Sequence, residues 1–293
     1  MQSSAVSCKL CGGDVSDFSE RNGFAIVKCR RCGFMFAPLP AGFDLNAVYR
    51  DDAYWSGGTN CGYQNYDDEW KASERFYRAR LARLKKLSKP GRLLEVGCAA
   101  GFFLEAARRD RWDVAGTEIS DSMRQRCAER AQCPVFASID EVAASGQRFD
   151  CVAMFEVIEH VTDPLALLRQ VRELIVPGGL LALSTPNFEG PEAARNPGDY
   201  HWFAPPVHIS YFGPATLSSC VREAGFAVLA MEGLLGQEEP PLPAPLAAIL
   251  APLRRGKRLR PRGLLGRLLR LYQRRRKDVL RWANGLDLYA RKI

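Results

Sequence analysis

Four of the chain's ten cysteines form two Cys-x2-Cys pairs, Cys8 with Cys11 and Cys29 with Cys32. A glycine follows each pair and permits the tight turn that directs two sulfurs at one ion. Four thiolates at this spacing are typical of a closed tetrahedral zinc site, which stabilises a short segment that has little core of its own. We therefore predict a structural zinc ribbon over residues 1–42, with unliganded or redox-active thiols as the alternative.

A second group of residues surrounds a small-residue turn that follows a short apolar run. Gly97 and Gly101 allow the backbone to approach a ligand closely, and a helix beginning at Phe102 presents free N–H groups to an anion. Glu118 ends the next expected strand, where a carboxylate can accept hydrogen bonds from both hydroxyls of a ribose. The later glycines of a G-x-G-x-x-G motif are missing, so the turn does not match a dinucleotide site.

The chain has only three histidines, His160, His201 and His208. All three follow the expected fourth and fifth strands, and an open α/β sheet binds its ligands at the carboxyl ends of its strands. An imidazole in this region can take the proton from an acceptor hydroxyl. His208 is our first candidate for such a base and His201 the second, whereas for His160 a structural role at its turn is equally open.

The elements that must position these residues alternate between strands and helices from Arg92 onward. This alternation is typical of a mostly parallel sheet with helices on both faces. A Pro-Gly-Gly sequence at residues 177–179 is expected to form a turn. Strands are expected over residues 93–96, 113–119, 149–155, 180–185 and 226–235, and helices over 66–87, 102–109, 163–176 and 216–224.

In combination these motifs resemble the class I S-adenosylmethionine (SAM)-dependent methyltransferases over roughly residues 70–235. The family motifs are matched in order by Glu95, Gly97, Ala99 and Gly101, by Glu118, and by residues 155–161, 176–179 and 184–187. The resemblance implies an α/β fold with a Rossmann-like seven-stranded sheet. It also implies SAM as the methyl donor and a last strand over residues 285–293 that pairs antiparallel.

The resemblance also implies which residues contact the donor. They are Glu95, Gly97, Cys98, Ala99, Gly101, Phe102, Glu118, Ile119, Asp140, Phe155 and Glu156. Residues 137–140 depart from the family pattern, and Asp140 stands there for the acid that many relatives use to hold the adenine amine. Cys98 also fits the role of a small core residue.

Two further segments suggest a class of acceptor. The His-Ile-x-x-Phe element at residues 208–212 and the cysteine-rich ribbon are similar to those of small-molecule and glycan-pathway methyltransferases. The resemblance therefore implies a small-molecule, glycan or lipid-linked acceptor, methylated at oxygen. Glu156-x2-Glu159-His160 is similar to a segment that binds a divalent cation in ubiquinone-pathway O-methyltransferases, although relatives without a metal requirement share it.

The acceptor walls are expected from residues 43–65 and 187–215. Aromatic side chains beside two of the histidines, Trp202, Phe203 and Tyr211, fit either an apolar acceptor wall or ordinary loop packing.

Charge is distributed unevenly along the 293 residues. The net charge is +8, yet residues 254–293 carry 15 of the 41 Lys and Arg and only 2 of the 33 Asp and Glu. The remainder of the chain is therefore mildly acidic. With 47% hydrophobic and 25% charged residues, the composition excludes disordered, collagen-like and coiled-coil proteins.

These observations divide the chain into a ribbon (1–42), a linker with an N-terminal helix (43–88), a SAM-binding core (89–235), an insertion (236–284) and a final strand (285–293). The insertion is expected to contain a Pro-rich linker and basic amphipathic helices over residues 254–281. Such helices fit an anionic membrane surface best; nucleic acid is less favoured, and a solvated or oligomer-contacting face is also open. No uninterrupted apolar stretch of about 18–20 residues, as a transmembrane helix needs, and no signal peptide is evident. We therefore expect a cytoplasmic protein, peripheral to the inner membrane surface if the basic helices bind there.

Two other functions remain open at this point. Some ribosomal-RNA methyltransferases also join a cysteine ribbon to this fold, but the acidic core and the sequence at residues 155–158 argue against RNA. A zinc-ribbon scaffold that has lost catalysis is the non-enzymatic alternative, and the intact glycine turn and Glu118 argue against it.

Overall fold

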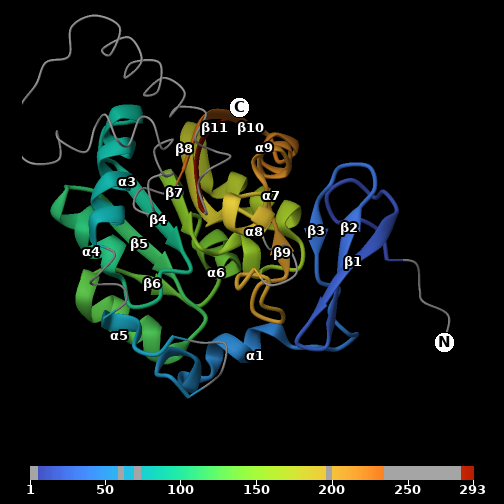
Figure 1. The fold of residues 1–293 in the computed structure, drawn as a ribbon. Helices are drawn as coiled ribbons and strands as arrows, with labels where there is room; N and C mark the ends of the chain where they lie inside the picture. The colour runs from blue at the N-terminus through green and yellow to red at the C-terminus, as the bar shows by residue number, and fades with distance from the viewer. Residues whose placement is uncertain (1–5, 59–62, 69–73, 196–199, 234–284) are drawn as a thin grey trace, which may run out of the picture.

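The computed structural model describes residues 6–58, 63–68, 74–195, 200–233 and 285–293 (Figure 1). Two sheets organise these residues, one of seven strands and one of four. The Pro-rich linker and the basic helices predicted over residues 254–281 lie outside the described residues. No helix in the described ranges is both long and apolar enough to cross a bilayer.

The seven-stranded main sheet has the strand order β10-β11-β8-β7-β4-β5-β6. Its strands are β4 (Arg92–Val96), β5 (Asp113–Thr117), β6 (Val135–Phe136), β7 (Phe149–Phe155), β8 (Ile175–Pro186), β10 (Phe226–Gly233) and β11 (Gly285–Lys292). The strands from β8 to β6 pair in parallel, whereas β11 pairs antiparallel with both β8 and β10. The predicted α/β fold is confirmed, including its antiparallel last strand.

Helices cover both faces of the main sheet (Figure 1). They are α3 (Glu74–Leu87), α4 (Phe102–Arg109), α5 (Asp121–Ala131), α6 (Ile139–Ala144), α7 (Pro164–Leu174) and α9 (Pro214–Glu223). The short helix α8 (Pro191–Arg195) packs instead in a cluster with Ile26 and Met35 of the N-terminal ribbon. Successive strand residues point to opposite faces, so Leu94 packs in the cluster that includes α7 and α9, and Leu93 in the one that includes α3 and α4. Both faces are buried, which explains why the strands are apolar without alternation.

Two predicted boundaries were wrong around β8. Helix α7 ends at Leu174 rather than at residue 176, and Pro177, Gly178 and Gly179 lie inside β8 instead of in a turn before it. Phe149 pairs with Ile175 and Cys151 with Leu180, so the Pro-Gly-Gly residues form an irregularity within one continuous strand. Proline and glycine residues occur both in turns and at such irregularities of a strand, so the local sequence does not distinguish the two.

The second sheet joins the N-terminal cysteine ribbon to the rest of the chain. Strands β1 (Val15–Arg21), β2 (Phe24–Cys29) and β3 (Met35–Phe36) pair antiparallel, and β9 (Ser210–Tyr211) adds a fourth strand beside β3. The Phe34 ring also packs 5.0 Å from the Phe212 ring. The ribbon therefore shares both a sheet and a core with the segment that contains His208.

A short helical segment leads from the ribbon to the main sheet (Figure 1). It contains α1 (Leu45–Arg50) and the 3-10 helix η1 (Asp52–Trp55). Asp44 and Asp51 begin these two helices, because their carboxylates accept hydrogen bonds from the first backbone N–H groups. The region predicted as a linker is thus ordered into helices along this stretch.

One buried arginine connects three elements of the core. Arg80 of α3 is 3% exposed, and its Nε and Nη2 atoms both lie 3.0 Å from Oδ1 of Asp287 in β11. Its guanidinium also lies 3.7 Å from Oε1 of Glu156 and stacks 4.1 Å from the Phe155 ring centroid at the end of β7. Arg80 therefore ties helix α3 to both β7 and β11.

We expect Arg80→Met to destabilise the fold by about 3 kcal/mol, because it leaves the Asp287 carboxylate buried without its partner. The free energy of unfolding, measured by urea denaturation, tests this. Arg78→Met is the matched control on the same helix, since the Arg78–Glu74 pair is exposed and such pairs contribute about 0.5 kcal/mol. Equal effects of the two substitutions would contradict a structural role for the buried pair.

Candidate functional site

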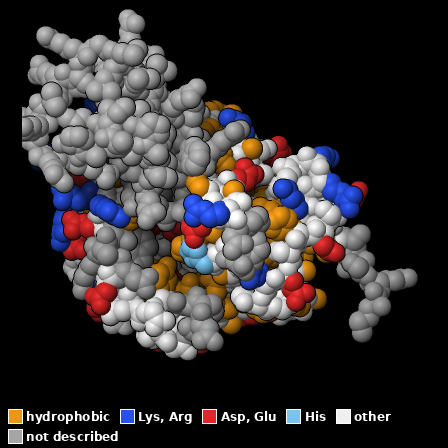
Figure 2. Space-filling model, in the orientation of Figure 1, with side chains coloured by type: hydrophobic (Ala, Val, Ile, Leu, Met, Phe, Trp, Pro, Cys, Tyr) orange, Lys and Arg blue, Asp and Glu red, His pale blue; other side chains and the backbone are white. Residues whose placement is uncertain are grey.

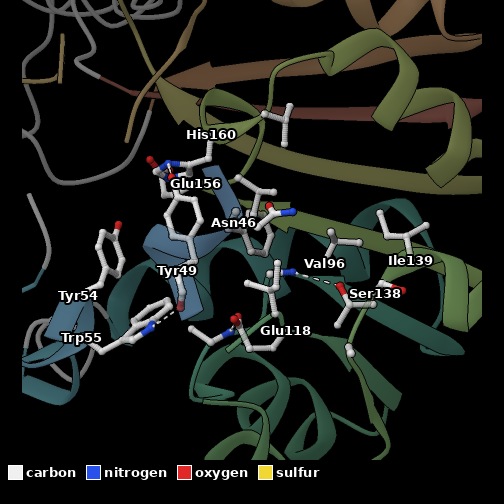
Figure 3. Close-up of a pocket in the computed structure, with 18 of the residues that line it drawn as sticks. Asn46, Tyr49, Tyr54, Trp55, Val96, Glu118, Ser138, Ile139, Glu156 and His160 are labelled. Carbon is white, nitrogen blue, oxygen red and sulfur yellow. Dashed lines mark hydrogen bonds between the residues drawn. The ribbon is translucent and has the colours of Figure 1, made fainter. Parts of the chain in front are cut away.

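A cavity of about 300 Å³ opens at the carboxyl ends of the central parallel strands. The ends of β4, β5 and β7 form one side, and α1 and η1 form the other (Figure 3). Hydrophobic side chains gather around the recessed centre of this face of the molecule (Figure 2). The lining residues are Asn46, Tyr49, Tyr54, Trp55, Tyr63, Tyr66, Val96, Gly97, Ala99, Thr117, Glu118, Ile119, Ala137, Ser138, Ile139, Phe155, Glu156, Val157, His160, Val161 and Leu167.

The glycine turn after β4 forms the floor of this cavity. Gly97 and Gly101 have φ angles of 69° and 79°, in the left-handed region that favours glycine. A Cβ on Gly101 would lie 2.7 Å from the Cys127 sulfur, and one on Gly97 would lie 2.8 Å from Val157. Both glycines are therefore required for the turn to pack between β4 and its neighbours.

Glu118 is buried at the end of β5 and faces the cavity (Figure 3). Its Oε2 accepts a hydrogen bond from Ala99 N and its Oε1 one from Ser120 N, each at 2.9 Å. A carboxylate can accept about four hydrogen bonds, so each oxygen retains capacity for one hydroxyl of a ribose. Burial raises the pKa of the Glu118 carboxyl, and the two backbone N–H groups oppose that shift.

Glu95 lies at the end of β4 and has no comparable partner. The side chain is buried, and its Oε2 has no hydrogen-bond partner among the described residues. Burial raises the pKa of Glu95 well above its usual range, with Arg80 opposing the shift. A buried carboxyl in this state would be stabilised by a cationic group of a ligand.

The predicted donor residues divide into two groups in the structure. Those that line the cavity are Gly97, Ala99, Glu118, Ile119, Phe155 and Glu156. Glu95, Cys98, Gly101 and Phe102 lie around the turn but not on the lining: Cys98 is buried with its sulfur 3.4 Å from that of Cys127, and Phe102 packs under Arg130. The exposed Asp140 lies in the first turn of α6, outside the lining, and the preceding Ser138 and Ile139 line the cavity instead.

Aromatic residues of the N-terminal segment form the opposite wall. The rings of Trp55 and Tyr63 stack with centroids 5.8 Å apart, and Tyr66 lies edge-on to Tyr63 at 4.8 Å. Tyr49 and Tyr54 continue the wall toward His160. The sequence analysis expected walls from residues 43–65 and 187–215: residues of the first segment line the cavity, and no described residue of the second does. The density of tyrosines in the first segment was the available signal.

Only one of the three histidines lines the cavity. His160 lies at its inner end, on the 3-10 helix η2 (Ile158–His160) that follows β7 (Figure 3). His208 is buried behind it, with the two ring centroids 4.8 Å apart. The side chain of His201 is 57% exposed and pairs with Glu192 at 3.1 Å, away from the cavity lining. The structure thus brings together two of the predicted bases and separates the third.

The two buried imidazoles are held by backbone carbonyls. The Nδ1 atoms of His160 and His208 lie 2.9 Å from the carbonyl oxygens of Val207 and Trp202, which can only accept a hydrogen bond. The Tyr49 hydroxyl contacts His160 Nδ1 at 2.8 Å and donates to Val207 O. Burial lowers the pKa of His160 to about 4 and that of His208 to about 3, so both rings are neutral near pH 7.

Glu159 and Glu156 lie beside these rings. Glu159 is 0% exposed, and burial together with the neighbouring Glu156 raises its pKa well above the usual range. Glu156 accepts a hydrogen bond from the Ser184 hydroxyl at 2.5 Å and faces Arg80. Two imidazoles and two carboxyl groups therefore lie together near this end of the cavity, and of these four side chains only those of His160 and Glu156 line it.

The aromatic residues near His201 and His208 pack mainly in a separate cluster. Phe203 and Tyr211 are buried there with Phe188 and Tyr200, and Trp202 packs against them. The Trp202 ring also stacks on that of His208, with centroids 5.3 Å apart. None of the three lines the cavity, so their placement agrees with loop packing.

The four N-terminal cysteines converge on one point. Their sulfurs all lie within 4.8 Å of one another, with Cys8 to Cys32 at 3.6 Å and Cys11 to Cys29 at 3.5 Å. Zinc–thiolate bonds of about 2.3 Å in a tetrahedron require sulfur separations of about 3.8 Å. Backbone N–H groups of Arg31 and Cys32 also point at the Cys29 sulfur. The four residues therefore fit a four-thiolate ion site.

Comparisons with known proteins agree with this geometry. The family model described as "Methyltransferase domain" matches residues 69–231. A crystal structure of a SAM-dependent methyltransferase from Archaeoglobus fulgidus is 18% identical, with a TM-score of 0.50 over 76% of this chain and 99% of that one. Magnesium protoporphyrin IX methyltransferase from Synechocystis PCC 6803, crystallised with bound SAM, is 14% identical, with a TM-score of 0.52 over 87% of this chain and 100% of that one. At these identities the two structures show the fold alone.

A curated relative is more similar in sequence. Ubiquinone biosynthesis O-methyltransferase of Cereibacter sphaeroides (strain ATCC 17025) is 31% identical over 163 residues, which cover 49% of this chain. The chain spans 63% of the length of that relative. The family match covers more than half of the chain and includes the whole glycine turn and Glu118. The chain therefore belongs to the family of SAM-dependent methyltransferases.

Proposed function

We propose that this protein transfers the methyl group of SAM to a hydroxyl of a small acceptor with an aromatic or apolar body. One observation carries the proposal: the same cavity is lined by Glu118 with its glycine turn at one end and by His160 at the other. A donor held by the first group and an acceptor held near the second would share one desolvated space. Alignment of two reactants in this way supplies most of what a methyl transfer needs.

The end of the cavity beside Glu118, here called the donor end, has groups that match the ribose, the carboxylate and the amino group of SAM. The two oxygens of Glu118 would accept the ribose hydroxyls, and the free N–H groups at the start of α4 would face its carboxylate. The buried carboxyl of Glu95 would receive the positively charged amino group. Ser138 and Ile139 replace the predicted Asp140 as neighbours of the adenine, because they line the cavity and Asp140 does not.

The acceptor end suits a flat or apolar molecule. The wall of Tyr49, Tyr54 and Trp55 provides aromatic faces, and Val161 and Leu167 add apolar surface. The curated relatives at about 30% identity are named as O-methyltransferases of ubiquinone biosynthesis, which supports oxygen as the methylated atom. Lipid-linked sugars remain within the proposal, since the cavity could hold the acceptor end of a larger molecule.

The chemistry requires one bond to form as another breaks. The acceptor oxygen attacks the methyl carbon, and the carbon–sulfur bond breaks with its electrons going to the sulfonium, which becomes a neutral thioether. The hydroxyl proton must leave, and the His160 end of the cavity is where it would be taken up. His208 supports this end from behind rather than contacting the cavity directly.

We also propose that the four-cysteine cluster holds a structural zinc ion. When bound, zinc would link the two cysteine turns and stabilise the sheet that β9 completes. With four thiolate ligands it would have no open position, so its role would be structural.

Glu118→Ala should weaken SAM binding by about 10–100-fold, because hydrogen bonds to a charged group contribute about 1.5–3 kcal/mol. Calorimetric titration of SAM into the purified chain measures this. Glu129→Ala is the control, since Glu129 lies exposed on α5. Unchanged affinity in a folded Glu118→Ala protein would remove the basis for the donor site.

His160→Ala should lower kcat by about 10²–10⁴-fold while leaving SAM affinity unchanged, because it removes the imidazole at the acceptor end only. The assay follows methyl transfer to an acceptor found by screening phenols and lipid-linked sugars. His201→Ala tests the alternative base, and we expect it to keep most of the activity because its exposed ring lies off the cavity. The reverse result would assign the base to His201.

Cys11→Ser should remove one zinc ion per chain and lower the midpoint of thermal unfolding by about 5 °C, the shift expected for a loss of about 2 kcal/mol. Elemental analysis and a thermal melt measure the two effects. Cys133→Ser, outside the cluster, is expected to change neither zinc content nor the melt. Zinc content that does not respond to Cys11→Ser would contradict the proposed site.

A further inference from the structure

Helix α5 carries three polar side chains at intervals of four residues, Ser122, Arg126 and Arg130, here called the α5 row. Residues four apart lie on one face of an α-helix. The helix begins soon after Glu118, yet none of the three side chains lines the cavity. Any effect of the α5 row on a ligand must therefore pass through the groups that it contacts.

Two members of the row bind the segment that carries the aromatic wall (Figure 1). The Ser122 hydroxyl donates a hydrogen bond to the Asp52 carboxylate in η1. Arg126 Nη2 lies 2.6 Å from Oδ1 of Asp67, and that oxygen is shielded from solvent. In the sequence the two acids stand before and after four aromatic residues that line the cavity, Tyr54, Trp55, Tyr63 and Tyr66. Helix α5 is thus attached on both sides of this part of the wall.

The third member, Arg130, holds the glycine turn. Its Nε donates a hydrogen bond to the carbonyl oxygen of Ala100 at 2.9 Å, and its guanidinium lies 3.7 Å from the centroid of the Phe102 ring. Its Nη2 also lies 3.9 Å from Oδ1 of Asp67. Arg130 therefore contacts the turn, the first residue of α4 and the same acid that Arg126 binds.

The wall and the glycine turn pack against each other at the donor end. Tyr66 is 4% exposed and packs in a cluster with Ala99 of the turn, and Trp55 and Tyr63 adjoin this cluster. Tyr63, Tyr66 and Ala99 all line the cavity. The shape of the donor end thus depends on how the wall is placed relative to the turn, and the α5 row contacts both.

Contacts outside a site can raise affinity by forming the site before the ligand arrives. When only molecules with a formed site bind, the apparent affinity is reduced by the fraction of molecules in which the site is formed. Contacts that keep the two sides of a site in place therefore strengthen binding without touching the ligand.

We propose that Arg126 and Arg130 are positioning residues for the methyl donor. Arg126 holds the wall through Asp67, and Arg130 holds the glycine turn through the carbonyl of Ala100. The proposal rests on the donor site of the proposed function and adds two residues that lie outside its cavity.

Calorimetric titration of SAM into variants of the full chain tests this role. Arg126→Met and Asp67→Asn should each weaken SAM binding by about 3–5-fold, as expected for one partly exposed ion pair. Arg130→Met should weaken it by about tenfold, because a hydrogen bond from a charged group to the turn is lost as well. Arg126→Lys keeps the positive charge and should recover most of the affinity.

A double-mutant cycle shows whether Arg126 acts through Asp67. In the Asp67→Asn protein, Arg126→Met should have little further effect on SAM affinity. Salt gives an independent measurement, since the difference in affinity between wild type and Asp67→Asn should shrink between about 0.05 M and about 0.5 M salt as the ion pair is screened. Additive effects of the two substitutions, with a difference that salt leaves unchanged, would overturn the role of Arg126.

Arg83→Met is the matched control for a purely structural effect. Arg83 and Glu232 are 29% and 43% exposed, against 39% and 30% for Arg126 and Asp67, and their ion pair joins α3 to β10 outside the cavity lining. Arg83→Met should lower the midpoint of thermal unfolding at least as much as Arg126→Met and leave SAM affinity unchanged. Equal losses of SAM affinity in the two variants would identify general destabilisation as the cause and contradict the positioning role.

The positioning role and the proposed function give different failures. If wild-type protein does not bind SAM, or if Glu118→Ala does not weaken binding, the donor site is wrong and the positioning role is lost with it. If SAM binding depends on Glu118 but neither Arg126→Met nor Arg130→Met weakens it, the positioning role alone is wrong.

Discussion

Buried acidic side chains gather at the edge of the main sheet where its parallel strands end, and the burial of each one requires a partner for its carboxyl group. Among the described residues Glu95, Glu118, Glu159 and Asp287 are buried there, beside a single buried arginine, Arg80. Arg80 compensates Asp287 directly, and backbone N–H groups partly compensate Glu118. Glu95 retains an oxygen without a hydrogen-bond partner among the described residues. The amino group of the proposed donor would bring positive charge to Glu95.

The N-terminal ribbon helps to position residues at this edge of the main sheet, although its cysteines lie away from the cavity. Pairing of β3 with β9 places His208 and Val207 against η2, and α1 then carries Tyr49 onto the same carbonyl of Val207. The ribbon and the helices after it thereby support the imidazole of His160, which lines the cavity. A four-thiolate ion would act at a distance by holding β2 and β3 in register.

The motifs with strict local chemistry were predictable. A turn with two left-handed glycines, an acid at the end of the next strand and four cysteines in two tight turns each leave a pattern in a short stretch of residues, and each lies where it was expected. Predictions failed where the same sequence pattern occurs in two different local structures. The Pro-Gly-Gly sequence forms a bulge within β8 rather than a turn, and the acid Asp140 lies outside the cavity while its neighbours line it.

The sequence by itself determined the fold family, the glycine turn and the cysteine cluster, because these depend on residues close together in the chain and on backbone conformations that few residue types allow. Tertiary structure decided which histidine lines the cavity, which buried acids have partners and which aromatic rings form the cavity wall. Those outcomes depend on pairs far apart in sequence, such as Arg80 with Asp287 and Glu159 with His208. Glu159 and His208 come together only when β9 joins the ribbon, an event that no periodicity or spacing along the chain records. The expected last strand β11 likewise did not identify Arg80 as the partner of Asp287.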